Sequence, residues 1–199
     1  MVEIAKVIVP PAKVRVHDRI MQIAGDLFYR RGIRAVGVDM IASEAGTNKM
    51  SFYRCFESKD DLIVEYLSDH AKNALVWWDT TVASHAGDPG AQIQALFDAQ
   101  LERATDADSR GCALANAAVE ITEPAHPARV VVENFKAELR RRFRALAHST
   151  GAHDPDALGD SLMLLWEGAC ATTLTFGTSP GPAETAAKAA QSLVSAFAR

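Results

Sequence analysis

The sequence is poor in cysteine, with only Cys55, Cys112 and Cys170 in a chain of 199 residues. Their number is odd and no pair has the C-x-x-C spacing, so the pattern excludes a disulfide framework and indicates reduced thiols in the cytoplasm. No apolar run reaches the roughly 18 residues that a membrane helix needs. The first residues are too few and too weakly apolar for a signal peptide. We therefore expect a cytoplasmic protein without a membrane partner.

Signals for strands and for phosphate-binding loops are missing as well. No convincing segment alternates apolar and polar residues, and the sequence has no internal repeat or low-complexity tract. The patterns G-x-G-x-x-G and G-x-x-x-x-G-K-[ST] do not occur, which excludes the two common glycine-rich phosphate loops. The absence of strand signals favours an all-α fold.

Helical periodicity is what the sequence contains, from His17 almost to its end. Apolar residues recur at 3.6-residue spacing, and glycine, proline or capping residues interrupt the pattern. Ser58 and Asp61 form a capping box that opens a long helix, and Asp154-Pro155 starts a later one. The predicted helices cover about 17–31, 38–46, 48–56, the long helix from 58, then 91–104, 112–122, 127–149, 155–177 and 182–198.

Three short helices before residue 56 cannot bury a core alone, so we expect the long helix to complete it. Pro10-Pro11 predicts a flexible N-terminal arm over 1–14. An N-terminal three-helix domain is predicted over 15–73, and a C-terminal helical domain over 74–199. The boundary falls inside the long helix, without a flexible linker.

The charge is divided unevenly along the chain. Residues 1–60 hold 10 Lys and Arg against 7 Asp and Glu, whereas residues 61–199 hold 11 against 18. The net charge of −4 argues against general affinity for nucleic acid. Such affinity is therefore expected at the N-terminal end alone.

The segment GTNKMSFYRCFESKDDL, residues 46–62, gathers polar and basic side chains directly after a glycine turn. A helix, a tight turn and a short helix form a helix-turn-helix, whose second helix enters the major groove of duplex DNA. Phe52 and Phe56 are expected to face inward, so that Tyr53 and Arg54 face outward. The residues predicted to contact DNA are Thr47, Asn48, Lys49, Met50, Ser51, Tyr53, Arg54 and Lys59.

These side chains suit different parts of a duplex. Lys49 supplies a point charge for phosphate or guanine, and Met50 fits against a thymine methyl group. Lys59 is expected to hold a phosphate together with the free N–H groups at the start of the long helix. The alternative for such a segment is an ordinary solvated helix face, which is common.

Residues 20–67 resemble the DNA-binding domain of TetR/AcrR-type transcriptional regulators. The matching positions are Ala24, Leu27-Phe28, Arg31-Gly32, Val38-Asp39, Ile41-Ala42, Ala45-Gly46, Lys49, Phe52-Tyr53, Phe56 and Ser58-Lys59. The resemblance implies a homodimeric repressor, less often an activator, with a variable C-terminal ligand domain. It also implies DNA contacts at Lys49, Tyr53 and Lys59. Gly37 and Cys55 depart from the family pattern, and each removes a polar contact that the family often has.

Patterns for catalysis or metal binding are weak. No His-x-x-x-His or His-x-x-Glu spacing supports a metal site, so neither a metal nor a cofactor is expected. Cys112 and His126 lack an oxyanion element and an orienting third group. A small all-helical enzyme using Cys112 or a histidine is one alternative reading, and a helical interaction module without DNA binding is another. The basic run over 136–144 is expected to be solvated.

Aromatic and polar residues on the later helices suit a pocket for an apolar or aromatic molecule, although such spacing is equally typical of a core. The candidate ligand residues are Phe97, Gln100, Asn116, Phe135, Trp166 and Cys170. Small and apolar stripes on the last two helices predict a four-helix dimer interface. Its residues are Leu158, Leu162, Leu165, Ala169, Phe176, Ala187, Ala190, Val194 and Phe197.

These features together predict a ligand-responsive repressor rather than an enzyme. The homodimer would bind a palindromic double-stranded DNA operator. A small apolar or aromatic effector packed among the helices at 91–176 would shift the helix from Ser58 and release the DNA.

Overall fold

The computed structural model describes residues 15–106, 108–176 and 181–198. These residues form nine α-helices and one short 3-10 helix, with no strand among them, so the predicted all-α class is confirmed. The predicted arm over 1–14 lies outside the described residues. The helices are α1 (Val16–Arg31), α2 (Val38–Glu44), α3 (Lys49–Cys55), α4 (Lys59–Ala83), α5 (Pro89–Ala104), α6 (Ala113–Glu120), α7 (Pro127–Ser149), α8 (Pro155–Phe176), η1 (Pro182–Thr185) and α9 (Ala186–Ala196).

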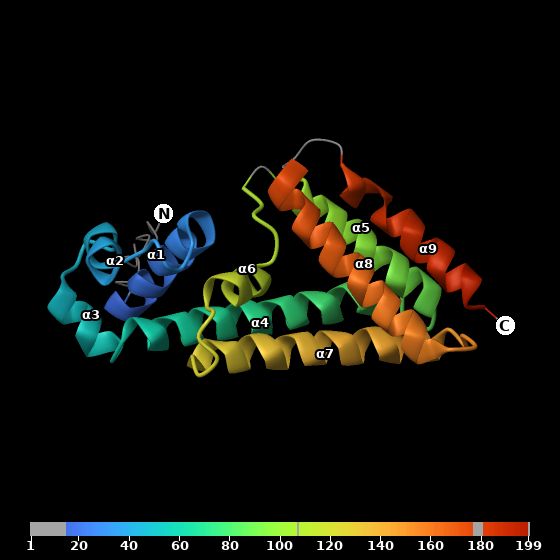
Figure 1. Cartoon of the computed structure of the whole chain (residues 1–199), viewed down its shortest axis with the longest axis horizontal. Coiled ribbons are helices and arrows are strands. Elements are labelled where there is room, and N and C mark those ends of the chain that lie inside the picture. Colours follow the sequence, from blue (N-terminus) through green and yellow to red (C-terminus); the bar gives the residue numbers. More distant parts are fainter. Residues whose placement is uncertain (1–14, 107, 177–180, 199) are drawn as a thin grey trace, which may run out of the picture.

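The three short helices α1, α2 and α3 gather at one end of the molecule, around the first turns of α4 (Figure 1). Phe52 from α3 and Leu62 from α4 are fully buried there, beside Ile20 of α1 and Ile41 of α2. Side chains from four helices thus make one small core, which none of the short helices could form alone.

Local signals read from the sequence set several helix ends. Gly32 ends α1 with a φ of 89°, a left-handed conformation that favours glycine. The Ser58 side chain accepts a hydrogen bond from Asp61 N at 3.1 Å and donates one to Asp61 Oδ2 at 2.8 Å. Ser58 is therefore the N-cap of α4, as predicted, and its hydroxyl also contacts the Asp61 carboxylate. Asp154 Oδ1 likewise accepts from Ala157 N at 3.1 Å, at the predicted start of α8.

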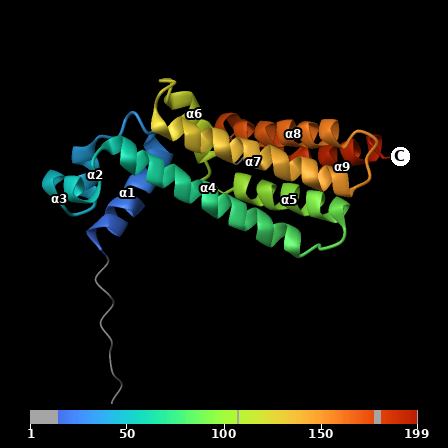
Figure 2. The same cartoon turned by 90° about the horizontal axis from the view of Figure 1, so that it is seen from below.

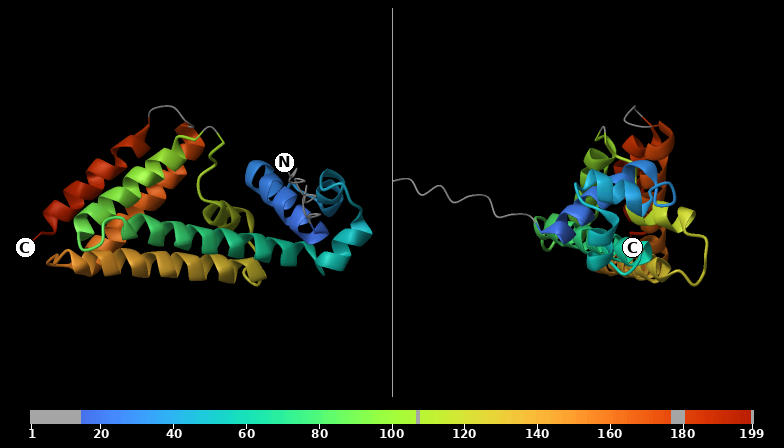
Figure 3. Two further views of the ribbon diagram at one scale, coloured as in Figure 1. Left: turned by 180° about the vertical axis from the view of Figure 1, so that it is seen from behind. Right: turned by 90° about the vertical axis from the view of Figure 1, so that its left-hand side faces the viewer.

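The helical body is built around α4 and α7, which run side by side along the molecule in both views (Figure 2). Helices α5, α8 and α9 cross them at the end away from the short helices (Figure 3). Trp78 from α4 meets Phe143 from α7 edge to face, with ring centroids 4.8 Å apart. The same long helix therefore has one end in the core of α1–α3 and the other end in the core of the body.

The basic run at 136–144 is not simply solvated, because each of its cations meets a carboxylate. Lys136 pairs with Glu167 of α8 at 2.6 Å, and Arg140 with Asp160 of α8 at 2.7 Å. The remaining pairs are Arg141 with Glu138, Arg142 with Asp79 and Glu138, and Arg144 with Asp156 and Asp160. Hydrogen bonds from Arg140 and Arg144 hold the pKa of Asp160 well below its ordinary value. The run joins α7 to α8 and α4, and its charge is neutralised within the chain.

No helix in the described part of the chain has the length and apolar character needed to cross a membrane.

Candidate nucleic-acid interface

The turn between α2 and α3 is held by backbone hydrogen bonds. Gly46 N donates to Ser43 O at 3.0 Å and Thr47 N donates to Ala42 O at 2.9 Å. Gly46 has a φ of 60°, which lets the chain reverse without steric strain. The buried Phe52 then fixes α3 against α1 and α2. The predicted helix-turn-helix arrangement is therefore present.

Helix α3 presents two large side chains to solvent. Met50 is 68% exposed and Tyr53 is 49% exposed, whereas Phe52 between them is fully buried. Arg54 is exposed beside Tyr53. Exposed apolar and aromatic groups on one short helix are typical of a contact surface. They lie on the face that a major groove would meet in a helix-turn-helix protein.

Lys49 lies at the start of α3 and has a local partner. Its ammonium is 3.3 Å from Asp39 Oδ1 at the start of α2, and both side chains are largely exposed. An exposed ion pair of this kind contributes little stability, so a phosphate group could compete for the lysine. The neighbouring Asp39 carboxylate would repel that same phosphate.

Asn48 and Ser51 cap α3. The Asn48 side-chain oxygen accepts a hydrogen bond from Ser51 N at 2.9 Å. This contact occupies the amide oxygen of Asn48, and its amide N–H groups make no hydrogen bond to another described residue. Thr47, just before the cap, is half-buried.

Lys59 differs from the predicted phosphate contact, because its side chain folds back onto the protein. Its ammonium donates to Ile33 O at 2.6 Å and lies 5.8 Å from the centre of the Phe28 ring. Burial lowers the pKa of Lys59 from its ordinary value. Periodicity could not show this contact, since Ile33 lies 26 residues earlier in the chain. The lysine ties the start of α4 to the loop after α1.

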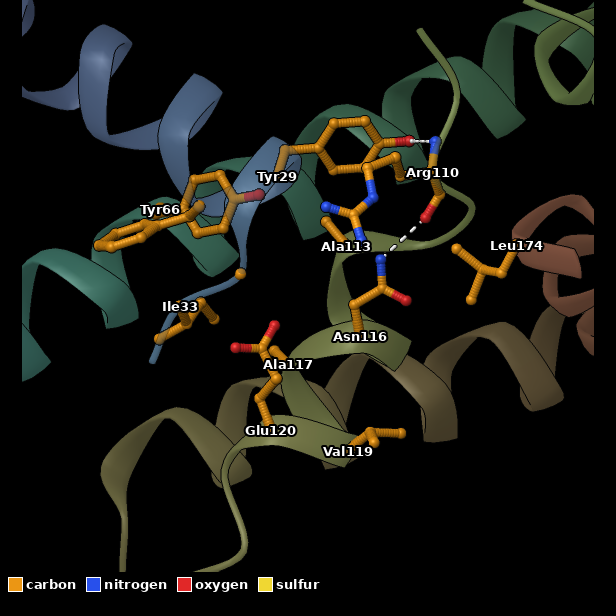
Figure 4. A pocket seen from close by; sticks show the side chains of 12 residues that line it. Tyr29, Ile33, Tyr66, Arg110, Ala113, Asn116, Ala117, Val119, Glu120 and Leu174 are labelled. Atoms are coloured by element: carbon orange, nitrogen blue, oxygen red, sulfur yellow. Dashed lines mark hydrogen bonds between the residues drawn. The ribbon is translucent and has the colours of Figure 1, made fainter. Parts of the chain in front are cut away.

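Hydrogen bonds also connect α1 and the loop after it to α6 and to the segments that flank α6 (Figure 4). The Tyr29 hydroxyl of α1 donates to Gly111 O at 3.0 Å and accepts from Arg110 N at 2.7 Å. In the loop after α1, Arg34 N donates to Glu120 Oε2 at 3.0 Å, and the Arg34 guanidinium pairs with Glu123 at 2.6 Å. We call these contacts of Tyr29 and Arg34 the junction at α6. A shift of α6 and its flanking segments would therefore move the hydrogen-bond partners of both residues.

Gly32 lies against that junction. A Cβ atom at this position would lie 2.9 Å from Glu120 Oε2, so the end of the flexible Glu120 side chain would have to shift. The junction surrounds a small cavity of about 200 Å³ that Asn116 lines, so this candidate ligand residue lies away from the others.

A larger cavity of about 610 Å³ lies in the helical body. Four of the six candidate ligand residues line it, namely Gln100, Phe135, Trp166 and Cys170. Phe97 is buried behind the wall, with its ring 5.5 Å from that of Trp166. Residues outside that candidate set also line the cavity, including Trp77, Trp78, Arg103, Cys112 and Lys136.

The two cysteines at this cavity differ in environment. Cys170 is buried, and the Gln100 side-chain amide lies 3.1 Å from its sulfur. Burial raises the pKa of the Cys170 thiol to about 12. Cys112 is half-buried, 3.9 Å from the Lys136 ammonium. No group of three or more His, Cys, Asp or Glu residues within the described ranges could hold a metal ion.

Five of the nine residues predicted for the dimer interface are buried within their own chain. They are Leu158, Leu162, Ala169, Ala187 and Ala190. These residues lie on α8 and α9, which pack against each other and against α5, and α8 also packs against α7. Their side chains are therefore not available to a second copy. The large apolar groups that α8 presents to solvent are Leu164, Leu174 and Phe176. On α8, Leu158, Leu162 and Ala169 of the predicted stripe thus lie on the inner face of the helix, whereas Phe176 lies among the exposed groups.

Comparison with known proteins agrees with this geometry. The family described as "Bacterial regulatory proteins, tetR family" matches residues 20–66. Transcriptional regulator AcuR of Cereibacter sphaeroides is 27% identical over 162 residues, covering 77% of this chain and 74% of AcuR. HTH-type transcriptional repressor DhaR of a Mycobacterium species is 26% identical over 169 residues, covering 79% of this chain and 82% of DhaR.

Solved structures share the whole fold. The TetR-family transcriptional regulator SCO4454 from Streptomyces coelicolor superimposes with a TM-score of 0.81 at 27% identity, covering 92% of this chain and 93% of that one. The helix-turn-helix matches the family, and the related proteins are regulators rather than enzymes. Residues 20–66 therefore match the DNA-binding domain of the TetR family, and the chain as a whole is similar to TetR-family transcriptional regulators.

Proposed function

We propose that this regulator is a repressor that binds a palindromic operator as a homodimer and is released by a small apolar or aromatic effector. The observation that carries the proposal is the joint presence of an exposed α3 surface and a cavity of about 610 Å³, linked by one continuous helix, α4. The similarity to DhaR, a transcriptional repressor, supports repression rather than activation.

Contacts to DNA are assigned to α3 and its cap. Lys49 contacts a phosphate or a guanine, and Arg54 contacts a phosphate. Met50 and Tyr53 contact base edges. Asn48, Ser51 and Thr47 sit at the groove-facing end of the helix. Lys59 acts as a positioning residue for the loop after α1, because its ammonium is engaged with Ile33 O.

The division of the chain near residue 73 is part of the same proposal. Tyr66 of α4 meets Phe28 of α1, with ring centroids 5.5 Å apart, whereas Trp78 of α4 meets Phe143 of α7. The DNA-binding domain would thus take the first half of α4 and the helical body the second half.

The dimer contact is assigned to the outer face of α8. Leu164 is 74% exposed, and Gly168 and Ala171 follow at helical spacing on the same exposed face. A Cβ atom at Gly168 would meet no neighbouring atom, so a second helix could approach closely there. This face, together with Phe176, offers an apolar surface to an identical copy.

Leu164→Glu tests the dimer contact. The charge would be buried against a second copy but would stay solvated on a free chain, so we expect monomers at concentrations where the wild-type chain is dimeric. Analytical ultracentrifugation measures the state, and Val119→Glu is the matched control because Val119 of α6 is 79% exposed. A Leu164→Glu dimer of unchanged affinity would contradict the assignment.

We assign the coupling between effector binding and DNA binding to α4 and to the junction at α6. An effector in the cavity would move Trp77 and Trp78 on α4 and the segment 110–113 that leads into α6. The hydrogen bonds of Tyr29 and Arg34 would pass this shift to α1. An effector that prefers the shifted state by about 1–3 kcal/mol would weaken DNA binding roughly 5–150-fold.

The experiment that tests the whole proposal has two stages. Selection from random duplexes should recover a palindromic site, and a thermal-shift screen should recover compounds that stabilise the protein. Each stabilising compound is then added to the operator complex, and fluorescence anisotropy measures release. The repressor-and-effector proposal fails if no compound that binds the cavity changes operator affinity.

Asp39→Asn is expected to raise operator affinity roughly fivefold, because it frees Lys49 and removes a negative charge beside the phosphates. Anisotropy at fixed salt measures the change. Asp98→Asn removes the same charge from α5, where Asp98 also has a local partner, Gln94, and should have no comparable effect. Equal effects of the two variants would show that only net charge matters.

A further inference from the structure

The cavity of the helical body has rigid aromatic walls. Trp77, Trp78, Phe135 and Trp166 line it. The rings of Trp78 and Trp166 lie 6.1 Å apart at 60°, and Phe143 packs edge to face against both, at 4.8 and 5.6 Å. Such interlocked rings hold a fixed shape and favour a flat aromatic guest.

Two indole N–H groups at this cavity lack an acceptor. Trp78 is 4% exposed and Trp166 is 7% exposed, yet neither indole nitrogen donates a hydrogen bond to any described residue. The indole N–H of a largely buried tryptophan usually donates to a protein group, a water molecule or a ligand. The two donors therefore call for acceptors that the described chain does not provide.

The cavity is bordered by both of these tryptophan side chains. Among the described residues, the side-chain nitrogen and oxygen atoms that are sealed from solvent without a partner are Arg19 Nε and Gln94 Oε1. The indole nitrogens of Trp78 and Trp166 are not sealed in this way. Both side chains are more than nine-tenths buried and both line the cavity, so a ligand in the cavity would lie against the two indole groups.

The charges around the cavity offset one another. Lys136 is neutralised by Glu167 at 2.6 Å, and Asp108 pairs with Arg30 at 3.4 Å. Two further charged residues of opposite sign, Arg103 and Asp106, line the cavity. The Arg103 guanidinium lies over the Trp77 ring, 4.7 Å from its centre. Neither sign dominates, so a ligand with a full charge would gain little to offset its desolvation.

We propose that this cavity binds a neutral aromatic carbonyl compound, whose carbonyl oxygen accepts a hydrogen bond from the indole N–H of Trp78 or Trp166 while its ring lies between the aromatic walls. The inference rests on the proposed effector function of the cavity and names the chemical class of that effector. An aromatic hydrocarbon would leave the donors unsatisfied, and an aromatic carboxylate would bring an unbalanced charge.

Three probes of similar shape separate these possibilities. Binding of 2-acetylnaphthalene, 2-ethylnaphthalene and 2-naphthoate to the full-length protein is measured by isothermal titration calorimetry without DNA. The ketone is expected to bind about tenfold more tightly than the hydrocarbon, because it satisfies a buried donor. It should also bind more tightly than the carboxylate. Equal or tighter binding of the hydrocarbon, or tightest binding of the carboxylate, would overturn the proposal.

Variants locate the hydrogen bond. Trp78→Phe and Trp166→Phe each keep an aromatic ring and remove the N–H, and one of them should reduce the ketone-to-hydrocarbon ratio to near one. Phe135→Leu alters the wall without removing a donor, so it should weaken both probes and leave the ratio unchanged. Because the ratio is taken within one variant, a general loss of packing cancels. An unchanged ratio in both tryptophan variants would exclude this hydrogen bond.

A measurement on the wild-type chain covers the case of a variant that does not fold. The chain has three tryptophans, so ¹⁵N-labelled protein should give three indole signals. The ketone should move at least one of them downfield, and the hydrocarbon should not. Operator release by the ketone is then measured separately. Selective ketone binding without operator release would support the ligand class and contradict the effector function of the cavity. Release by the hydrocarbon alone would support the effector function and contradict the ligand class.

Discussion

Replacement of Lys49 and Tyr53 together by alanine is expected to lower operator affinity by at least about a hundredfold. Each side chain leaves α3 on its exposed face, and a contact of this type contributes about 1–3 kcal/mol. A dimer loses the contacts in both half-sites, so the effects accumulate. Anisotropy with the selected operator and with a scrambled duplex measures the loss, which should be larger for the operator because Tyr53 is assigned to a base edge.

Lys188→Ala is the matched control, because Lys188 is an exposed lysine on α9, far from α3 in the fold. It should leave the operator affinity almost unchanged. Lys49→Ala alone should also reduce the dependence of affinity on salt, since one cationic contact to phosphate is lost. Unaltered operator binding by the double variant would remove α3 as the DNA-reading helix.

Gly159→Ala is expected to cause the largest loss of stability of any single methyl addition in the body. A Cβ atom at Gly159 of α8 would lie 2.6 Å from Arg144 Cα and 2.8 Å from Arg144 N in α7. Backbone atoms cannot move aside like a flexible side chain, so α7 and α8 must separate. We expect a loss of about 2–3 kcal/mol despite the better helix propensity of alanine. Thermal unfolding at one fixed protein concentration measures it.

Gly90→Ala is its control, since Gly90 lies in the first turn of α5 and its added Cβ would meet only Asp88 Oδ1, at an ordinary 3.5 Å. This variant should be neutral or slightly more stable. The separation of α7 from α8 would also disturb the pairs of Arg144 with Asp156 and Asp160. A Gly159→Ala protein as stable as the Gly90→Ala protein would show that the two helices adjust without cost.

Much of the DNA-binding end could be predicted from short-range patterns. The capping box at Ser58, the glycine turn at Gly46 and the alternation of Phe52 with Tyr53 are local signals, because each depends on residues within about one helical turn. Local signals need no knowledge of the rest of the fold. For this reason the helix ends and the outward face of α3 agree with the structure.

The structure adds most where two faces of a helix look alike or where a side chain contacts a residue far away in the sequence. Helix α8 is apolar on both sides, so periodicity could not tell that Leu162 packs inward while Leu164 points to solvent. The contact of the Lys59 ammonium with Ile33 O, at 2.6 Å, joins residues 26 positions apart, and no local pattern contains it. The position of Asn116 at the smaller cavity likewise depends on how α6 packs against α1.

The sequence by itself determined that the chain is all-helical, where most helices begin and end, and which short helix follows the glycine turn with its outer face exposed, because these properties depend on local hydrogen bonding and on hydrophobic period. Only the tertiary structure decided which face of α8 is free, where the basic run of α7 finds its carboxylates and which aromatic groups enclose the cavity. The indole N–H groups of Trp78 and Trp166 are the clearest case. Whether a buried donor is satisfied depends on every chain segment that packs around it, and no pattern within one helix contains that information.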